Sequence, residues 1–408
     1  MESNKSKYEP SLSPVRKLPQ DLLGQIFSLY VEGDQRLSEA PYREWLHDEK
    51  AVLRRFLKCP PWALGQVCRM WRATALSFPQ LWTSFYVDHA YTPTLSSIST
   101  HRHLDPLLTQ LERCQNQPIE VFLAHYTDTL PKRSVLAALC ENGVAMRWTS
   151  ATIYLHKCTC EVMQPYAGTF RNITSLHLHA KDFGPYPEEE DQIFDMFYDA
   201  PNLRTPSIWG RCWADHSDPV LSLPWNQITR YTAREADNDY WTSNGFHYDV
   251  LPLLKNVEEC WLDCTFSTDE PEYIRSGAGP LTLLHLHTLV LSSVDWNRPN
   301  SAINRLLDQL SLPALRVLKF RNGIPGGSRS LQNMLSRSDY SLDELVLFDV
   351  RDIDHVNDEI NGLLNSHQLA SLHNLTICSD HSGESEFCLR MLDALTVRPE
   401  RKPLLPNL

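Results

Sequence analysis

A hexad of apolar positions, L-x-x-L-x-L, recurs through the chain from residue 148 onward. Such alternation of apolar and polar residues is typical of a strand that buries one face. The nine starts are 25 to 30 residues apart, with a mean of 28. This even spacing predicts a repeated unit with one strand per copy over residues 148–397. The clear copies begin at Ile173, Leu286, Leu315, Leu342 and Leu372, and weaker copies begin at Trp148, Leu203, Ile228 and Val257.

Three segments between the hexads have apolar residues at helical spacing, which predicts a helix in each. Pro201 and Pro313 are expected to end the first two helices before the next strand. Each unit is then a helix, a proline turn and a strand. Right-handed crossovers between such units give a parallel sheet with helices on one side. The predicted helices hold Ile193, Phe194 and Phe197; Ile303, Leu306, Leu307 and Leu310; and Ile360, Leu363 and Leu364.

The repeat resembles the leucine-rich repeat, whose period is about 20–29 residues. The asparagine ladder of regular leucine-rich repeats is missing, so we expect an irregular solenoid. In each strand the first, fourth and sixth hexad positions should face the core, and the third, fifth and seventh the open side. The predicted open face holds Tyr154, His177, His179, Trp209, Arg230, Arg234, Glu259, Trp261, Asp263, Lys319, Arg321 and Phe348.

Exposed Trp, Tyr and Arg are enriched in the hot spots of protein interfaces. We therefore predict that Tyr154, Trp209, Arg234, Trp261 and Phe348 bind a protein client. The alternative interpretation is an ordinary surface, or one that the chain's own loops cover.

Two amphipathic segments lie near the N-terminus. In residues 18–30, LPQDLLGQIFSLY, the apolar residues share one helical stripe that contains Gly24, although a glycine costs a helix about 1 kcal/mol relative to alanine. In residues 62–82, Leu64, Val67, Cys68, Trp71 and Ala75 repeat at spacings of three and four, and Pro79 should stop the helix. On spacing alone these are two helices of any small bundle.

The pairing of LPxDLLxxIF with QVCRxWRxxALxxPxLW resembles the F-box, in the form common in mushroom-type fungi, over about residues 15–85. The usual F-box joins its first two helices by a short connection, whereas residues 31–61 intervene here. This insert is expected to be partly helical because its apolar residues form an amphipathic stripe, and similar inserts are frequent in the fungal family. Its apolar stripe holds Trp45, Val52, Leu53, Phe56 and Leu57.

The resemblance implies a non-enzymatic subunit that recognises substrates for a Skp–cullin–F-box ubiquitin ligase. Such proteins bind a Skp-family adaptor, which bridges to a cullin. The alternatives are an adaptor-bound repeat scaffold that acts without ubiquitination, and an enzyme with an unfamiliar site. Carried over to this chain, the adaptor-facing residues are Leu18, Pro19, Leu22, Ile26 and Phe27 from the first helix, and Val67, Cys68, Trp71 and Leu76, shared with the core, from the second.

The expected fold class is α/β, with an N-terminal helical F-box followed by a leucine-rich-repeat-like solenoid that has a parallel sheet on one side and helices on the other. The expected parts are a disordered tail, the F-box, a connecting segment with the solenoid cap, the solenoid and a second tail. Their ranges are 1–11, 12–85, 86–147, 148–397 and 398–408.

Composition is ordinary for a soluble protein, with 42% hydrophobic and 22% charged residues over 408 positions. Neither a secretory signal nor an apolar run long enough for a membrane span is found, so a cytoplasmic or nuclear protein without membrane contact is expected. Net charge is −12. Nucleic-acid binding needs clustered positive charge, so we expect no nucleic acid and favour a basic protein client.

Candidate chemistry is sparse. Cys158 and Cys160, with His156 and His177 or His179, could be drawn as a zinc site, but structural zinc sites show two Cys/His pairs at wider spacing. Buried or strand-edge thiols are the preferred interpretation. No Walker loop, GxGxxG, GxSxG or HExxH motif occurs. We predict no metal, no cofactor and no catalytic residue.

Overall fold

The computed structural model describes residues 18–37, 61–88, 97–124, 133–155, 157–180, 195–210, 221–234, 250–264, 280–293, 301–321, 328–338, 342–348 and 369–378. The chain divides into two compact units, residues 1–149 and 150–408, and each is described by itself. The predicted tails, residues 38–60 of the predicted insert and the predicted helix around Ile360 lie outside the described residues.

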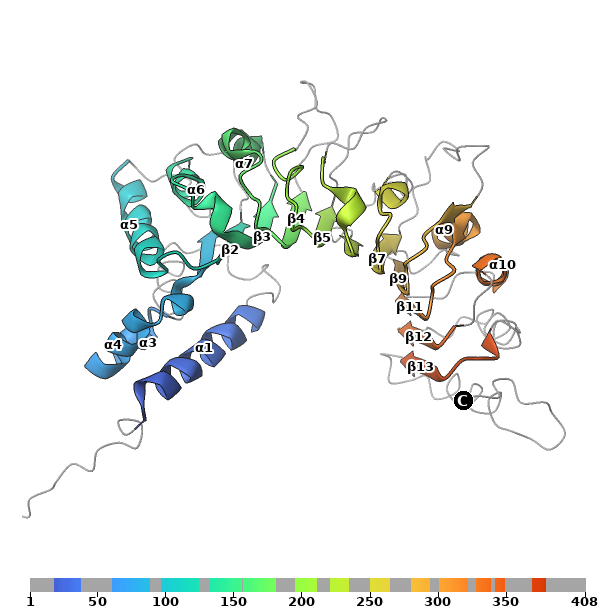
Figure 1. The fold of residues 1–408 in the computed structure, drawn as a ribbon, viewed down its shortest axis with the longest axis horizontal. Helices are drawn as coiled ribbons and strands as arrows, with labels where there is room; N and C mark the ends of the chain where they lie inside the picture. Colours follow the sequence, from blue (N-terminus) through green and yellow to red (C-terminus); the bar gives the residue numbers. More distant parts are fainter. Residues whose placement is uncertain are drawn as a thin grey trace, which may run out of the picture. The chain divides into compact units, whose positions relative to one another are not determined.

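A helix begins at Gln20 within the predicted segment 18–30 and continues to Leu37 (Figure 1). The second predicted helix is broken at Cys68, whose backbone is extended and whose Sγ accepts a hydrogen bond of 3.5 Å from the Trp71 N–H. This break shifts the helical phase, so the single stripe expected from Leu64 to Ala75 is wrong, and Val67 is 60% exposed. The elements are α1 (Gln20–Leu37), α3 (Leu64–Val67), α4 (Arg69–Ser77) and η3 (Pro79–Trp82).

Tryptophan packing forms the centre of the first unit. The buried Trp82 indole donates a hydrogen bond of 2.8 Å to the Ala75 carbonyl and meets the Trp62 ring edge to face at 5.1 Å. The Arg113 guanidinium lies 4.4 Å from the Trp82 ring and 4.6 Å from the Trp62 ring. The chain segment that follows Pro79 is therefore fixed against α4 by both polar and apolar contacts.

Gly24 has a packing reason for its place inside α1. A Cβ atom built at this position would overlap the aromatic ring of Phe78, which lies directly over the helix backbone. The cost of glycine to the helix is therefore offset by a close approach between α1 and the end of α4.

The first unit also contains a parallel strand pair that was not predicted, in residues assigned to the end of the F-box and to the connecting segment with the solenoid cap. Ser84 pairs with Glu120, and the pairing continues to Asp88 and Ala124. The elements of this part are β1 (Ser84–Asp88), α5 (Ser97–Arg113), β2 (Ile119–Ala124), α6 (Arg133–Cys140) and η5 (Ala145–Arg147).

The second unit contains a large parallel sheet whose strands lie side by side in the order in which they occur along the chain (Figure 1). Every strand of this sheet in the second unit overlaps one of the nine predicted hexads, so the predicted strands are confirmed. A separate pair is formed by β8 (Leu281–Thr282) and β10 (Leu310–Ser311). In the second unit the strands of the large sheet are β3 (Trp148–Tyr154), β4 (Ser175–Ala180), β5 (Thr205–Gly210), β6 (Arg230–Arg234), β7 (Glu259–Cys264), β9 (Thr288–Ser293), β11 (Val317–Arg321), β12 (Glu344–Phe348) and β13 (Asn374–Cys378).

Equal hexad positions lie opposite one another across the sheet. Leu318 of β11 pairs with Leu289 on one side and with Leu345 on the other, and all three are at most 1% exposed. The first, fourth and sixth positions are buried in the first eight hexads, as predicted. Leu375 and Ile377 of β13, the last strand described, are only half-buried.

The linkers between strands differ from one another, against the prediction of a helix in each. The helix around Ile303 is confirmed as α9, but Leu310 belongs to β10. Residues 196–199 are turns, and there the predicted helix is wrong, although Phe197 is buried against Phe170. Figure 1 shows the longer linker helices on one side of the sheet. The linkers contain α7 (Lys157–Met163), η6 (Gln164–Tyr166), η7 (Trp225–Gln227), η8 (Leu251–Leu253), α9 (Ser301–Gln309) and α10 (Ser328–Ser338).

Candidate functional site

Side chains at the seventh hexad position form a row of stacked rings on the open face of the sheet. The rings of Tyr154 and His179 stack with centroids 4.3 Å apart and an interplanar angle of 8°. His179 in turn lies 4.9 Å from the Trp209 ring at 37°. The three residues pair in register on β3, β4 and β5. Strands in a sheet are about 4.8 Å apart, so in-register rings meet at stacking distance.

The row continues with cations. Arg234, in register with Trp209, places its guanidinium carbon 5.0 Å from the Trp209 ring and 4.1 Å from the Trp261 ring. Arg321 places its guanidinium carbon 5.3 Å from the same Trp261 ring. We call Tyr154, His179, Trp209, Arg234, Trp261 and Arg321 the stacked row. Alternating aromatic and guanidinium groups are attracted by about 0.5–2 kcal/mol per contact.

Small side chains on β9 allow the contact between Arg321 and the Trp261 ring. Arg321 lies on β11 and Trp261 on β7, and β9 runs between them. Between them β9 presents Val290 and Ser292 on the open face, in register with Trp261 and Arg321 respectively. The long arginine side chain can therefore cross over β9 to reach the indole.

Hydrogen bonds orient both indoles of the stacked row. The Trp209 Nε1–H donates to Ser207 Oγ at 3.0 Å, and the Trp261 Nε1–H donates to Asp263 Oδ1 at 3.3 Å. Each partner lies two residues from its tryptophan, and in a strand such residues share one face. The ring orientations are thus set by side chains of the same strand.

The stacked row has an uncharged half and a charged half. Burial, with a smaller contribution from His177, lowers the pKa of His179 to about 4, so its imidazole is neutral at physiological pH. Loss of hydration lowers the pKa of Arg234, the Asp263 carboxylate opposes this shift, and Arg321 adds to it. Arginine nevertheless stays protonated, because its normal pKa is above 12.

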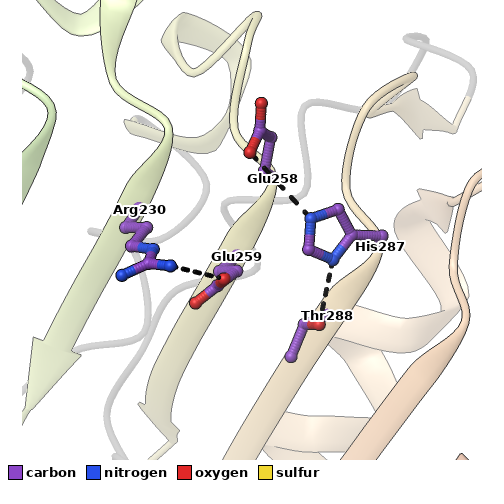
Figure 2. A network of polar contacts seen from close by, with 5 residues as sticks. All are labelled: Arg230, Glu258, Glu259, His287 and Thr288. Carbon is purple, nitrogen blue, oxygen red and sulfur yellow. Dashed lines mark hydrogen bonds and ion pairs between the residues drawn. The ribbon is translucent and has the colours of Figure 1, made fainter.

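A network of polar contacts joins β6, β7 and β9 near their N-terminal ends (Figure 2). Arg230 pairs with Glu259 at 3.1 Å, and Glu258 approaches His287 at 4.0 Å. His287 Nδ1 lies 3.0 Å from Thr288 Oγ1. The Arg230 and Glu259 side chains are 63% and 40% exposed, and such exposed pairs contribute about 0–1 kcal/mol. We assign this network a supporting role.

The structure places all five predicted client-binding residues on the open face. Tyr154, Trp209, Arg234 and Trp261 belong to the stacked row. Phe348 pairs in register with Arg321 and is half-buried. Among the described residues, no ring or guanidinium stacks on Phe348.

A second candidate surface lies on α1 in the first unit. Leu22, Ile26, Leu29 and Tyr30 are 43%, 49%, 69% and 51% exposed. Their spacing of four, three and one puts them on one side of the helix. We call these four residues the α1 apolar face. Val67 of α3 and Leu76 of α4 are 60% and 44% exposed.

Phe27 is a correction to the predicted adaptor-facing residues. It is only 1% exposed, and its ring lies 4.9 Å from that of Trp71, so it holds α1 against α4. Leu18, Cys68 and Trp71 are half-buried, and Pro19 is exposed. Sequence reasoning missed Leu29 and did not select Tyr30, although both continue the helical spacing from Leu22 and Ile26.

Within the described ranges, no group of three or more His, Cys, Asp and Glu residues could hold a metal ion. The side chains of His156 and Cys158 lie outside the described residues. Cys160, Cys260 and Cys264 are buried, and burial raises the pKa of the Cys260 thiol. No helix in the part of the chain that the structure describes is long and apolar enough to cross a membrane.

No family model matches the chain, and no curated protein matches it in sequence.

Proposed function

We propose that this protein is a substrate-recognition subunit of a Skp–cullin–F-box ubiquitin ligase, with an F-box in its N-terminal part and a leucine-rich-repeat-like solenoid after it. The observation that carries the proposal is the α1 apolar face, which lies within the segment that resembles the F-box. The adaptor would cover this face, and the solenoid would hold a protein client.

The physical argument concerns the exposed side chains of α1. The four side chains of the α1 apolar face do not stabilise the fold while they are exposed to water. Clusters of exposed apolar side chains mark interaction sites. An amphipathic helix that presents such a face binds a groove on a partner. Burying each large side chain contributes roughly 1.5–3 kcal/mol. Leu22 and Ile26 are about half exposed, so covering both accounts for roughly 1.5–3 kcal/mol of adaptor affinity in total.

The second unit supports a binding role rather than a chemical one. Its open face carries the stacked row, whose Trp, Tyr and Arg residues are the types enriched in interface hot spots. A client held there would be present at high effective concentration near the ubiquitin-conjugating enzyme. The protein itself would catalyse no step.

Co-expression with a Skp-family adaptor tests the F-box assignment. We expect the full chain to co-purify with the adaptor. Leu22→Ala with Ile26→Ala should weaken binding about tenfold to a hundredfold, since both side chains are about half exposed and roughly 1.5–3 kcal/mol of burial is at stake in total. Leu284→Ala is the matched control, because this leucine is 62% exposed but lies on the second unit. Unchanged adaptor binding by the folded double variant would overturn the assignment.

Capture from cells with the proteasome blocked tests the ligase role. Recovery of adaptor, cullin and a polyubiquitinated client supports the substrate receptor. Recovery of adaptor and client without cullin or ubiquitin chains would instead support a scaffold that acts without ubiquitination.

A further inference from the structure

Cations on the open face of the sheet fall into two classes. Arg230 pairs with Glu259 at 3.1 Å, and Lys319 pairs with Glu344 at 3.5 Å. Arg234 and Arg321 form no ion pair or hydrogen bond with any residue that the structure describes. Both guanidiniums stack on Trp261 instead, at 4.1 Å and 5.3 Å from its centroid. Two like charges are thus held against one ring.

Stacking leaves binding capacity in both guanidiniums. A guanidinium has five N–H donors at its edge, whereas a ring contact uses its π face. The Asp263 carboxylate is close enough to affect the pKa of Arg234, but it also accepts the Trp261 indole N–H. Among the residues that the structure describes, one carboxylate beside two guanidiniums leaves a surplus positive charge at this point.

We propose that Arg234, Trp261 and Arg321 form a binding site for an anionic side chain, carboxylate or phosphate, of a protein client. This inference deepens the proposed function and rests on it for the role of the open face. The net charge of −12 favours a basic client overall. At the centre of the stacked row, however, the two arginines attract a negatively charged group. Direct contacts at hydrogen-bond distance outweigh the long-range field of the acidic chain, which salt screens over about 10 Å.

The surroundings fit a protein segment better than a nucleic acid. Glu259, Asp263 and Glu344 contribute carboxylates to the same face. A polyanion would meet these carboxylates and the charge of the acidic chain, whereas nucleic-acid sites need several clustered cations. A single anionic side chain needs only the surplus charge. The neutral half of the stacked row can then contact apolar residues of the same segment.

Binding of oriented peptide pools to the immobilised full-length chain tests the site. The pools share randomised flanks and carry glutamate, phosphoserine, glutamine or lysine at the fixed central position. We expect retention of the glutamate pool, the phosphoserine pool or both at roughly tenfold or more above the glutamine pool, as for a charge-assisted hydrogen bond. The lysine pool should bind least. The relative retention of the two anionic pools distinguishes a carboxylate from a phosphate ligand.

Substitutions in the proposed site test which residues cause the preference for anionic peptides. Arg234→Gln with Arg321→Gln should remove it, and Arg321→Gln alone, at an exposed position that tolerates change, should weaken it. Arg230→Gln is the matched control, because this arginine lies on the same face but already has a carboxylate partner. Asp263→Asn should strengthen retention of both anionic pools by removing a competing negative charge.

Several results would overturn the site. They are equal retention of all pools, preference for the lysine pool, an anionic preference that survives the double arginine variant, or single-stranded RNA binding in place of the peptides. Adaptor binding is measured on the same preparations. If the unmodified chain binds the adaptor but shows no anionic preference, this site alone is rejected, whereas failure of the unmodified chain to bind the adaptor rejects the proposed function.

Discussion

The two candidate surfaces present large side chains to solvent in opposite ways. The α1 apolar face leaves Ile26 and Tyr30 about half exposed. The stacked row covers its aromatic rings with one another and with guanidiniums, so that Trp209 and Trp261 each have a partner at 5.0 Å or less. When a partner excludes water from an uncovered apolar face, the free energy of the complex is lowered. A stacked row is already ordered, and what it offers a partner is polar edges and charge.

The largest effect is expected from a substitution in the core of the sheet, compared with the same substitution at an exposed position. Leu318→Asp would bury a carboxylate at a position that is fully enclosed between β9 and β12. An unpaired buried charge costs several kcal/mol or more, so the second unit should lose its cooperative thermal transition. The same substitution at Leu284, which is 62% exposed, should leave that transition in place. Circular dichroism on both variants checks this, and a folded Leu318→Asp protein would contradict the register.

A smaller effect on stability is expected on α1, where substitutions on the buried and the exposed side of the helix should differ. Phe27→Ala should lower the free energy of unfolding of the first unit by about 3–5 kcal/mol, because it removes the ring that packs on Trp71. Ile26→Ala, one residue away, should change stability by less than about 1 kcal/mol and act on adaptor binding instead. Urea unfolding measures the difference. Equal destabilisation by the two changes would mean that α1 buries both sides.

Sequence patterning predicted the sheet well because a strand has a period of two residues and the hexad repeats it nine times. Burial of Leu289, Leu318 and Leu345 follows directly from that pattern. The same signal was present and overlooked in Ile119, Val121 and Leu123 of β2, all buried at alternate positions.

Linkers were harder to predict because short apolar clusters fit several local structures. Phe197 reaches the core from a turn, which helical spacing alone does not distinguish from a helix. Helix α10 was missed, although Leu331, Met334 and Leu335 have helical spacing and are buried. A short linker can bury a large residue without a complete helix, as η7 does with Trp225.

The candidate surfaces were predicted in position but not in detail. Register alone placed Trp209 and Arg234 side by side. It could not show that Arg321 would cross β9 to Trp261, because that contact depends on the small Ser292 side chain between them. On α1, the motif resemblance selected Phe27, which the three-dimensional packing assigns to the core.

Acid should weaken the neutral half of the stacked row. His179 has a folded-state pKa of about 4, below the usual 6.5, so the unfolded chain binds its proton first. Its contribution to stability is therefore fully present above about pH 6.5 and is lost as the pH falls toward 4, by on the order of 1–3 kcal/mol. His179→Phe keeps an aromatic ring between Tyr154 and Trp209 and should remove this part of the pH dependence. Urea titrations between pH 7 and 4 on both proteins check it, and identical profiles would contradict the shift.

The smallest expected effect tests whether the charged half of the stacked row stabilises the protein at all. A double-mutant cycle with Arg234→Met and Trp261→Leu should give a coupling energy of about 0.5–2 kcal/mol, since the guanidinium lies 4.1 Å from the ring and is partly shielded from water. The matched cycle uses the exposed ion pair of Arg230 and Glu259, changed to Met and Gln, and should give about 0–1 kcal/mol. Added salt should reduce the second coupling more than the first, because exposed pairs are screened more strongly. If the Arg234 cycle gave no coupling, the guanidinium would lie on the indole without stabilising it, and its role would be confined to ligand binding.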